Sequence, residues 1–496
     1  MGNAAVDFSG KPFHFIGIGG IGMSAIAHIL AEKKFPVSGS DLNLNHITHR
    51  LSEQGVRVFM QQDESNLSTF LAEQSESPPS ASHPSASHHS QSLLPQVICS
   101  TAIDPSNIEY RAAVNLGCPI FHRSDVLAAL MEDYSSIAVG GTHGKTTTSS
   151  LIAYLLLKAG LDPTIVVGGE VDAWDGNARL GQGDYLVAEA DESDGSLVKF
   201  KPHIGIVTNI ELDHPDHYKS LDDVIDIFQA FRRQSTIFVG NLDCPTLREI
   251  FDVDISYALD ASTGADYTVD NLAFCSTHTS ATVYERGECL GTLTLRLLGQ
   301  HNLSNALAAV AVGRYLGLQF QTIASILATF EGAHRRFEQR GYYSGITFLD
   351  DYAHHPSEIK ATLAAAQTQA SVLESGDRKR IVAVFQPHRY SRTASFLDDF
   401  AQSFQAADLV VISDIYSAGE ENTYGISGQT VAEAIAQYQS AVTYQATLAA
   451  VESFLKDTLQ SGDLVLFLGA GNLNKVIPDL LDFYRQKQDQ VLQSSI

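Results

Sequence analysis

The sequence predicts an α/β protein with three domains: a Rossmann-like domain over residues 1–133, a central domain over 134–331 with a parallel sheet and a small antiparallel part, and a Rossmann-like domain over 332–496. Two observations predict this fold class. A chain of 496 residues is too long for one core, because domains commonly contain roughly 100–200 residues. Short apolar runs also alternate with amphipathic runs of helical length, which is typical of βαβ units.

The N-terminal domain begins with a glycine-rich loop between an expected strand and an expected helix. Apolar FHFI precedes GIGGIGMS, in which Gly17, Gly19 and Gly22 have GxGxxG spacing. Backbone N–H groups of such a loop bind a diphosphate at the positive end of the helix. Asp41 follows the next expected strand, where an acid accepts hydrogen bonds from a ribose or a base. A nicotinamide, a flavin or another nucleotide diphosphate fits this pattern, and a strand–helix turn without a ligand remains the alternative.

One segment of this domain differs from the rest in composition. Residues 75–92 read SESPPSASHPSASHHSQS and are dominated by Ser, Pro and His. Such a composition contains too little apolar surface to offset the entropy lost on ordering. We predict a disordered surface insertion, and we interpret its histidines as incidental rather than as metal ligands.

The central domain is predicted to begin with the strand SSIAV and to continue into a second phosphate-binding loop, from Gly140 to Thr146. The loop reads GTHGKTT, and Val139 stands where a strict P-loop has its first glycine, so the loop is a shortened variant. Its backbone amides are expected to cradle phosphates, Lys145 to neutralise their oxygens, and Thr146 to hold Mg²⁺. The loop therefore predicts a site for ATP and Mg²⁺.

Acidic and polar residues follow the next two expected strands of this domain. YLVAEA ends near Glu189, and IGIVTNI is followed by ELDHPDH, which contains His214. The carboxyl ends of parallel strands meet at one edge of a sheet, and Mg²⁺ prefers oxygen ligands. We favour functional roles for Glu189 and His214; the alternative is that these charges only solvate loops. Short alternating stretches between about residues 254 and 298 predict the antiparallel part.

A third α/β block contains the expected strands ITFLDD, RIVAVF, DLVVIS and DLVLFL. Arg389 and Arg392 stand in the loop after RIVAVF, where two guanidinium groups can hold a carboxylate. A solvated basic turn is the alternative interpretation of this pair.

Charge and hydropathy exclude several function classes. The formal net charge of −25 argues against nucleic acid as a partner, because phosphate backbones are bound mainly by Lys and Arg. The apolar runs are too short for membrane insertion, and the N-terminus does not resemble a secretory signal. We therefore expect a cytoplasmic protein.

Beyond these patterns, the chain resembles the ATP-dependent Mur ligases that build the peptidoglycan peptide. The resemblance covers nearly the whole chain in order, through GIGGIGMSAIA, GSD, GTHGKTTT, AEADESDGS, TNIELDH, LGQHNLSNALAA, HRRFE, DDYAHHP, FQPHRYSRT, DIYSAGE and LGAGN. Ala353 replaces a glycine usual in the family, and Asn472 replaces an acid that is often found there. The family contains no nicotinamide, so the resemblance favours a uridine diphosphate sugar on the first loop.

Carried over by position, the resemblance implies a role for each motif. The diphosphate of the sugar nucleotide is expected to contact Gly17, Gly19, Gly20, Gly22 and Ser24. Asp41 is expected near the uracil or its ribose, and Ser100 and Thr101 beside the sugar. ATP is expected against Gly140, Thr142, His143, Gly144, Lys145, Thr146 and Thr147, with its adenine near His301, Asn302 and Asn305 and with Arg336 and Asp351 reaching it from the third domain. Thr146 and Glu189 are expected to bind one Mg²⁺ and His214 a second. The amino acid and the substrate carboxylate are expected near His354, His388, Arg389 and Arg392. Of these, His388 is predicted only to bind substrate. The predicted catalytic residues are Lys145, His214, His354, Arg389 and Arg392.

The implied reaction is the ATP-dependent ligation of L-alanine to the lactyl carboxylate of UDP-N-acetylmuramate through an acyl phosphate. Three alternatives remain open. A sister ligase of the family adds another amino acid or a peptide; a dehydrogenase uses the first loop for NAD; a regulatory module binds nucleotide without turnover. The expected assembly is a monomer or a homodimer.

Overall fold

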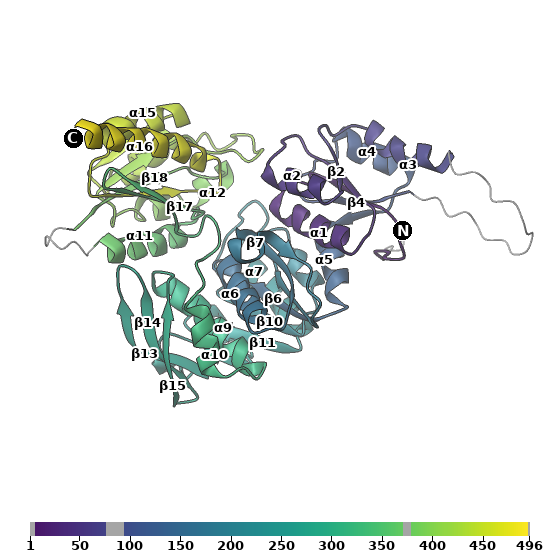
Figure 1. The fold of residues 1–496 in the computed structure, drawn as a ribbon, viewed down its shortest axis with the longest axis horizontal. Coiled ribbons are helices and arrows are strands. Elements are labelled where there is room, and N and C mark those ends of the chain that lie inside the picture. Colours follow the sequence, from purple (N-terminus) through teal and green to yellow (C-terminus); the bar gives the residue numbers. More distant parts are fainter. Residues whose placement is uncertain (1–4, 76–93, 371–377, 495–496) are drawn as a thin grey trace, which may run out of the picture. The chain divides into compact units, whose positions relative to one another are not determined.

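A computed structural model describes residues 5–75, 94–370 and 378–494 (Figure 1). The chain forms two compact units, which we call unit 1 (residues 1–139, 160–205 and 230–236) and unit 2 (residues 140–159, 206–229 and 237–496). The division falls inside the predicted central domain, so the predicted boundaries after residues 133 and 331 stay predictions. The predicted disordered insertion lies outside the described residues, except for Ser75, at which a helix ends.

The N-terminal part of unit 1 is a doubly wound parallel sheet with the strand order β3-β2-β1-β4-β5. The order reverses beside β1, which is where ligands bind in open parallel sheets. Its elements are β1 (Phe13–Ile16), α1 (Ile21–Glu32), β2 (Val37–Ser40), α2 (His46–Glu53), β3 (Arg57–Phe59), α3 (Ser65–Ser75), β4 (Gln96–Cys99), α4 (Ile108–Leu116), β5 (Ile120–His122) and α5 (Arg123–Met131). The predicted Rossmann-like domain is therefore confirmed.

Four more strands complete unit 1, in the order β8-β7-β9-β6. They are β6 (Ser135–Gly140), β7 (Thr164–Val171), β8 (Gly176–Arg179) and β9 (Tyr185–Glu189), and β8 alone among them runs antiparallel to its neighbour. Helix α1 packs against β7 and β8. Asn177 of β8 donates to the carbonyl oxygen of Ile21 and to Ser24 Oγ (3.2 Å), so the first turn of α1 is fixed by a strand from another part of the chain.

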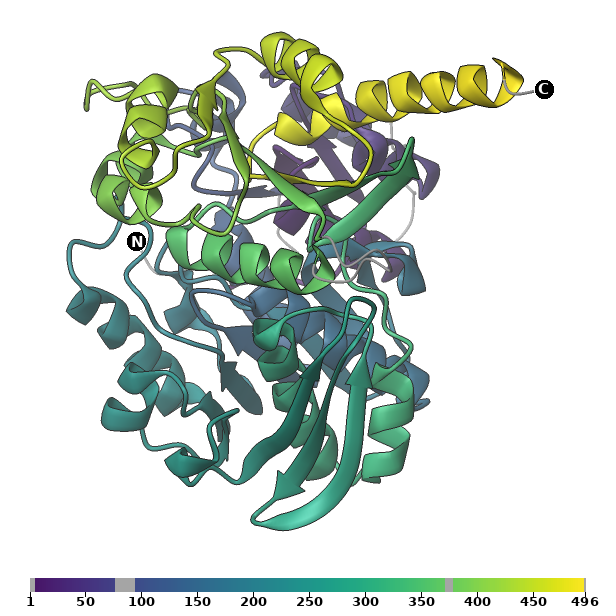
Figure 2. The ribbon, with the colours of Figure 1, turned by 90° about the vertical axis from the view of Figure 1, so that its left-hand side faces the viewer.

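The parallel core of unit 2 continues into a long antiparallel meander, as predicted (Figures 1 and 2). A β-bulge interrupts β13 between Asp270 and Ala273. The helix α9 is buried nearly all round because Ala, Leu and Val occupy every face, and it packs against α6. The elements are α6 (Lys145–Lys158), β11 (Ile237–Asn241), α8 (Pro245–Ile250), β12 (Ile255–Tyr257), β13 (Tyr267–Phe274), β14 (Thr279–Glu285), β15 (Glu288–Leu295), α9 (Gln300–Tyr315) and α10 (Phe320–Leu327), while β10 (Ile204–Val207) and α7 (Leu221–Gln234) cross the division between the units.

The C-terminal part of unit 2 is a six-stranded sheet with the order β16-β17-β21-β18-β19-β20, parallel except for the edge strand β16. Helices cover both faces, and β18 is apolar after its first residue because both of its faces are buried. The elements are β16 (Glu338–Tyr343), β17 (Ile346–Asp351), α11 (Pro356–Ala370), β18 (Arg380–Phe385), α12 (Tyr390–Ser395), α13 (Leu397–Ala401), β19 (Leu409–Ile412), α14 (Gly428–Ile435), β20 (Val442–Tyr444), α15 (Leu448–Thr458), β21 (Asp463–Leu468) and α16 (Ile477–Ser494). The predicted α/β class is confirmed. Within the described ranges, no helix combines the length and the apolar character that a bilayer crossing requires.

Candidate active site

The loop from Gly140 to Thr146 lies between β6 and α6, as predicted, and its conformation depends on glycine. Gly144 has a φ of +81°, which L-residues rarely adopt, and a Cβ placed there would come within 2.6 Å of Asn305 Oδ1. The Lys145 ammonium donates to the carbonyl oxygens of Gly141 (2.6 Å) and Thr142 (3.1 Å). The cation therefore lies over its own loop, at the place where a phosphate is cradled in such loops.

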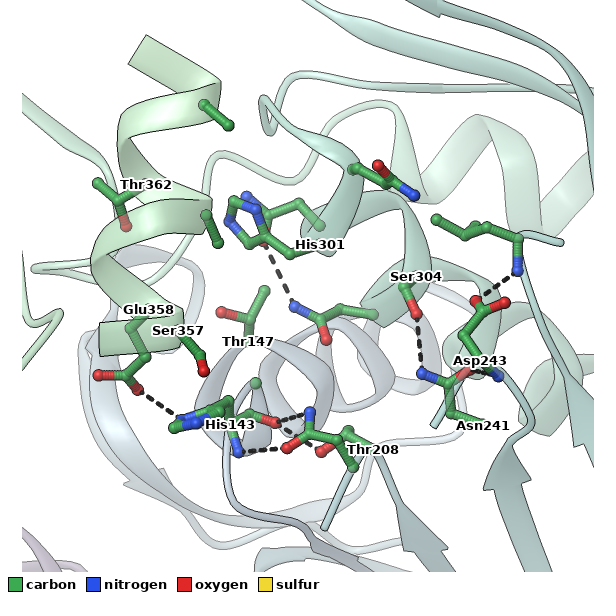
Figure 3. Close-up of a pocket in the computed structure, with 18 of the residues that line it drawn as sticks. His143, Thr147, Thr208, Asn241, Asp243, His301, Ser304, Ser357, Glu358 and Thr362 are labelled. Atoms are coloured by element: carbon green, nitrogen blue, oxygen red, sulfur yellow. Dashed lines mark hydrogen bonds and ion pairs between the residues drawn. The ribbon is translucent and has the colours of Figure 1, made fainter. Parts of the chain in front are cut away.

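A cavity of about 670 Å³ lies beside this loop within unit 2 (Figure 3). Most of the predicted ATP residues line it: His143, Gly144, Thr147, His301, Asn302, Asn305, Arg336 and Asp351. Asn241, Ser304, Leu259 and Leu272 also line the cavity and were missed by the sequence reasoning. The volume is in the range of small-molecule sites, and the wall combines apolar side chains with a few amides and acids.

Helix α9 contributes the predicted base contacts to the cavity wall. Asn305 Oδ1 accepts a hydrogen bond from Thr148 Oγ1 (3.2 Å), and Asn302 donates to the carbonyl oxygen of Leu298 (2.8 Å). Burial lowers the pKa of His301 to about 4, so this imidazole is neutral at pH 7. Asn305 thus ties α9 to α6, and Asn302 holds the segment just before α9.

Two predicted residues of the third domain reach the same region. Arg336 donates to Thr146 Oγ1 (3.2 Å). Asp351 accepts from the backbone N–H groups of Phe337 (2.7 Å) and Ala353 (2.8 Å), and burial raises its pKa to about 6. Within unit 2, the loop and the third domain are therefore in direct contact.

Arg392 and Asp213 form a buried, two-pronged ion pair. Arg392 Nε donates to Oδ1 (2.9 Å) and Nη2 to Oδ2 (3.1 Å), and the two residues are 2% and 5% exposed. Burial favours the neutral acid, but the Arg392 charge outweighs it and holds the pKa of Asp213 below its usual range. His214, which adjoins the pair, has a φ of +55°, and Arg389 contacts Asp216 (3.2 Å) and Glu420 (3.1 Å). Both predicted clamp arginines therefore have acidic partners in this structure.

His354 and His388 lie next to this ion pair, with ring centroids 5.8 Å apart. Burial lowers the pKa of His354 to about 4, and that of His388 to about 2. A neutral His354 whose Nδ1 lies 2.9 Å from the carbonyl oxygen of Tyr352 must carry its proton on Nδ1, since a carbonyl only accepts. Its Nε2 is then a proton acceptor.

These shifts predict how the stability of unit 2 depends on pH. The pKa values of His301, His354 and His388 in the folded protein lie below the histidine pKa of the unfolded chain, near 6.5. Their contribution to stability is therefore present above about pH 6.5 and is lost as the pH falls below it, because the unfolded chain then takes up protons that the folded protein does not. Asp351, with its raised pKa, opposes this loss between about pH 6 and 4. The three histidines outweigh one acid, so we expect net destabilisation on the order of 3 kcal/mol or more by pH 4.5. Calorimetry between pH 4.5 and 7.5 measures this loss of stability. The unfolding temperature should decrease as the pH is lowered, and it should decrease less steeply in His301→Gln. An unfolding temperature that does not change with pH would contradict the depressed pKa values of the three histidines.

In unit 1, the first glycine loop is held by Asp41. Gly17 has a φ of +82°, and Asp41 Oδ2 accepts a hydrogen bond from the N–H of Gly19 (2.8 Å). Ser24 is buried and donates to the carbonyl oxygen of Ile21 (3.0 Å), so its hydroxyl faces the helix backbone. Of the remaining predicted residues, Gly20 lies on this loop, Gly22 in the first turn of α1, and Ser100 and Thr101 directly after β4. Their roles toward a sugar nucleotide stay predictions.

Arg123, at the start of α5, is a further residue of this region that the sequence reasoning missed. Its guanidinium lies close to Gly22, where an added Cβ would meet Nη1 at 3.1 Å, and it pairs with Asp191 (3.0 Å). Glu189, the predicted metal ligand, ends β9, and its carboxylate accepts from the N–H of Gly168 (2.9 Å). A side chain at residue 168 would fill the space of that carboxylate, so the glycine there leaves room for it.

Comparison with known proteins gives matches over nearly the whole chain. Family models match residues 12–135 (Mur ligase family, catalytic domain), 139–313 (Mur ligase middle domain) and 335–471 (Mur ligase, glutamate ligase domain). A UDP-N-acetylmuramate–L-alanine ligase of Nostoc punctiforme is 62% identical over 477 residues, which cover 96% of this chain and 97% of that protein. A protein of the same name from Microcystis aeruginosa is 58% identical over 482 residues, covering 97% and 98%.

Solved structures give the same result for the fold. The crystal structure of a UDP-N-acetylmuramate-alanine ligase from Thermotoga maritima is similar with a TM-score of 0.79 and 26% identity, covering 96% of this chain and 99% of that one. A murein peptide ligase from Psychrobacter arcticus shares the fold, with a TM-score of 0.69 and 21% identity over 96% and 99% of the two chains. With three matching domain models and relatives this similar over nearly its full length, the chain belongs to the Mur ligase family.

Proposed function

We propose that this enzyme ligates L-alanine to the lactyl carboxylate of UDP-N-acetylmuramate and converts ATP to ADP and phosphate. The observation that carries the choice of substrates is the 62% identity to a relative of that name over nearly both full chains. The cavity beside Lys145 supports the ATP part, because it is lined by most of the residues that the motifs predicted.

The chemistry requires a carboxylate to become an electrophile. The substrate carboxylate attacks the γ-phosphate of ATP, and the resulting acyl phosphate is then attacked by the amine of L-alanine. Negative charge builds up around the γ-phosphate in the first step, so a positioned cation stabilises it, and Lys145 supplies that cation. Thr146, Glu189 and His214 are the residues that would hold Mg²⁺, which screens phosphate charge when bound.

The donor set is compatible with a hard metal ion. Thr146 offers a hydroxyl, and Glu189 has a carboxylate for which Gly168 leaves space. Both are oxygen ligands of the kind that Mg²⁺ prefers.

His354 is suited to the second step. L-alanine enters as an ammonium and must lose a proton before its nitrogen can attack. His354 is neutral at pH 7, with its proton on Nδ1 directed at the carbonyl oxygen of Tyr352, so the lone pair of Nε2 can accept a hydrogen bond from the nitrogen of L-alanine and orient it. Arg389 and Arg392 would attract a carboxylate to the same region, in exchange for their present acidic partners.

ADP release in the presence of UDP-N-acetylmuramate and a panel of amino acids tests the proposal. We expect release with L-alanine, and none with NAD added in place of ATP. Release that requires a longer peptide would instead assign a sister ligase, and ATP binding without turnover on any acceptor would assign a binding module. A monomer or homodimer in the cytoplasm stays the expectation for its assembly and location.

A further inference from the structure

The side chain of His143, in the middle of the nucleotide loop, is directed at two acids. Its Nδ1 lies 3.2 Å from Glu358 Oε1, and its Nε2 lies 3.5 Å from Glu211 Oε2 (Figure 3 shows the first pair). Burial alone would lower the pKa of His143, but the hydrogen bonds to Glu211 and Glu358 outweigh it and raise the pKa to about 10. His143 is therefore an imidazolium between two carboxylates at neutral pH.

Glu358 connects this cation to the predicted catalytic histidine. Its second carboxylate oxygen, Oε2, accepts from the backbone N–H groups of His354 (2.9 Å) and His355 (3.2 Å) at the start of α11. The neighbouring Ser357 donates to Glu211 Oε2 (2.7 Å). The nucleotide loop, the segment after β10 and the first turn of α11 are thus joined through one charged cluster, which we call the His143 cluster (His143, Glu211, Ser357 and Glu358).

A metal ion is a poor alternative occupant of this cluster. Ligand atoms of His143, Glu211 and His355 lie within 4.8 Å of one another, which is close enough to surround an ion. His355 Nδ1 accepts a hydrogen bond from the N–H of Ser357 (3.3 Å), so its neutral ring carries the proton on Nε2 and cannot ligate through that atom. His143 Nδ1 forms a hydrogen bond with Glu358 (3.2 Å), and Nε2 lies 3.5 Å from Glu211 Oε2, so both ring nitrogens face carboxylates. The imidazolium itself provides the positive charge that the two acids require.

We propose that His143 is a positioning residue, whose charge fixes Glu358 and through it the backbone at His354, so that His354 is held in place beside the nucleotide loop. This inference rests on the proposed function and assigns the His143 side chain a role other than contact with ATP. Without the imidazolium, the carboxylates of Glu211 and Glu358 lose the cation that they share and repel each other. The first turn of α11 then loses its tie to the loop, and small misplacements of a reacting group are costly.

His143→Gln removes the charge and keeps a polar side chain of similar length. We expect kcat for ADP release with L-alanine to fall roughly 10- to 100-fold, while the Kd for ADP alone changes less than about 3-fold, because the loop backbone is retained. Amide hydrogen exchange at residues 354–360 should become faster. His278→Gln, which removes a half-buried histidine of the β13–β14 turn, is the matched control and should change none of the three values.

The double variant His143→Gln/Glu358→Gln separates positioning from a general loss of structure. Because His143 acts through Glu358, the double variant should lose no more kcat than the more impaired of the two single variants, and Glu358→Gln alone should reproduce the faster exchange. Unchanged kcat and unchanged exchange in His143→Gln would overturn the proposal, as would strictly additive losses. Hydrogen exchange and ADP binding need no turnover, so they test the His143 cluster even if L-alanine proves not to be the substrate.

Discussion

Lys145→Ala is expected to lower the rate of ADP formation by about 10³-fold or more and to leave the fold intact. The ammonium lies over the carbonyl oxygens of Gly141 and Thr142, where a phosphate is cradled in loops of this kind. Removing one preorganised group that stabilises transition-state charge commonly costs about 10²–10³-fold, and a full positive charge at a phosphate costs more. Steady-state ADP release at saturating substrates measures the effect.

Lys158→Ala is the matched control for this variant, because Lys158 ends the same helix that Lys145 begins. It should ligate at the normal rate, and both variants should unfold near the temperature of the unchanged protein. Near-normal turnover in a folded Lys145→Ala protein would remove Lys145 from the catalytic group.

Arg392→Met is expected to lower the free energy of unfolding by about 3–5 kcal/mol. The substitution keeps much of the side-chain volume but leaves the Asp213 carboxylate buried without its main partner. Breaking one side of a buried ion pair is costly because the remaining charge has lost both water and its counter-ion. Urea unfolding of the variant and the unchanged protein measures the difference.

Two companion variants make this result specific. Arg389→Met removes a more exposed pair with Asp216 and Glu420 and should cost about 1 kcal/mol or less. Arg392→Met/Asp213→Asn should be more stable than Arg392→Met, since no unpaired charge remains. If Arg392→Met unfolds at the same urea concentration as Arg389→Met, the ion pair is not a stabilising element.

The sequence predicted the order of the elements and both glycine loops because those features are local. An apolar run followed by GIGGIG or GTHGKT specifies a strand, a tight turn and a helix within about twenty residues, whatever the rest of the chain does. The meander after β12 was predictable for the same reason, since alternation of side chains is a property of each strand.

The partners of the site residues were not predictable in this way. Arg392 is 179 residues from Asp213, and His143 is 215 residues from Glu358, so no spacing rule connects them. Glu358 did have a local signal: it stands three residues after His355 and two after Pro356, where an acid bonds the free N–H groups of a helix start. Arg123 had none, because its contact with Gly22 depends on how α5 lies beside the loop.

The bulge in β13 affects the shape of the cavity beside the loop from Gly140 to Thr146. Asn271 takes a φ of +52° there, and the next residue, Leu272, forms part of the cavity wall from the antiparallel end of the sheet. The meander thus contributes an apolar side chain to the cavity wall, on a strand that carries none of the predicted ATP residues. A smaller or larger apolar residue at position 272 would widen or narrow the cavity without altering any ionisable group. Position 272 is therefore the place to substitute when the cavity is to accept bulky nucleotide analogues or inhibitors.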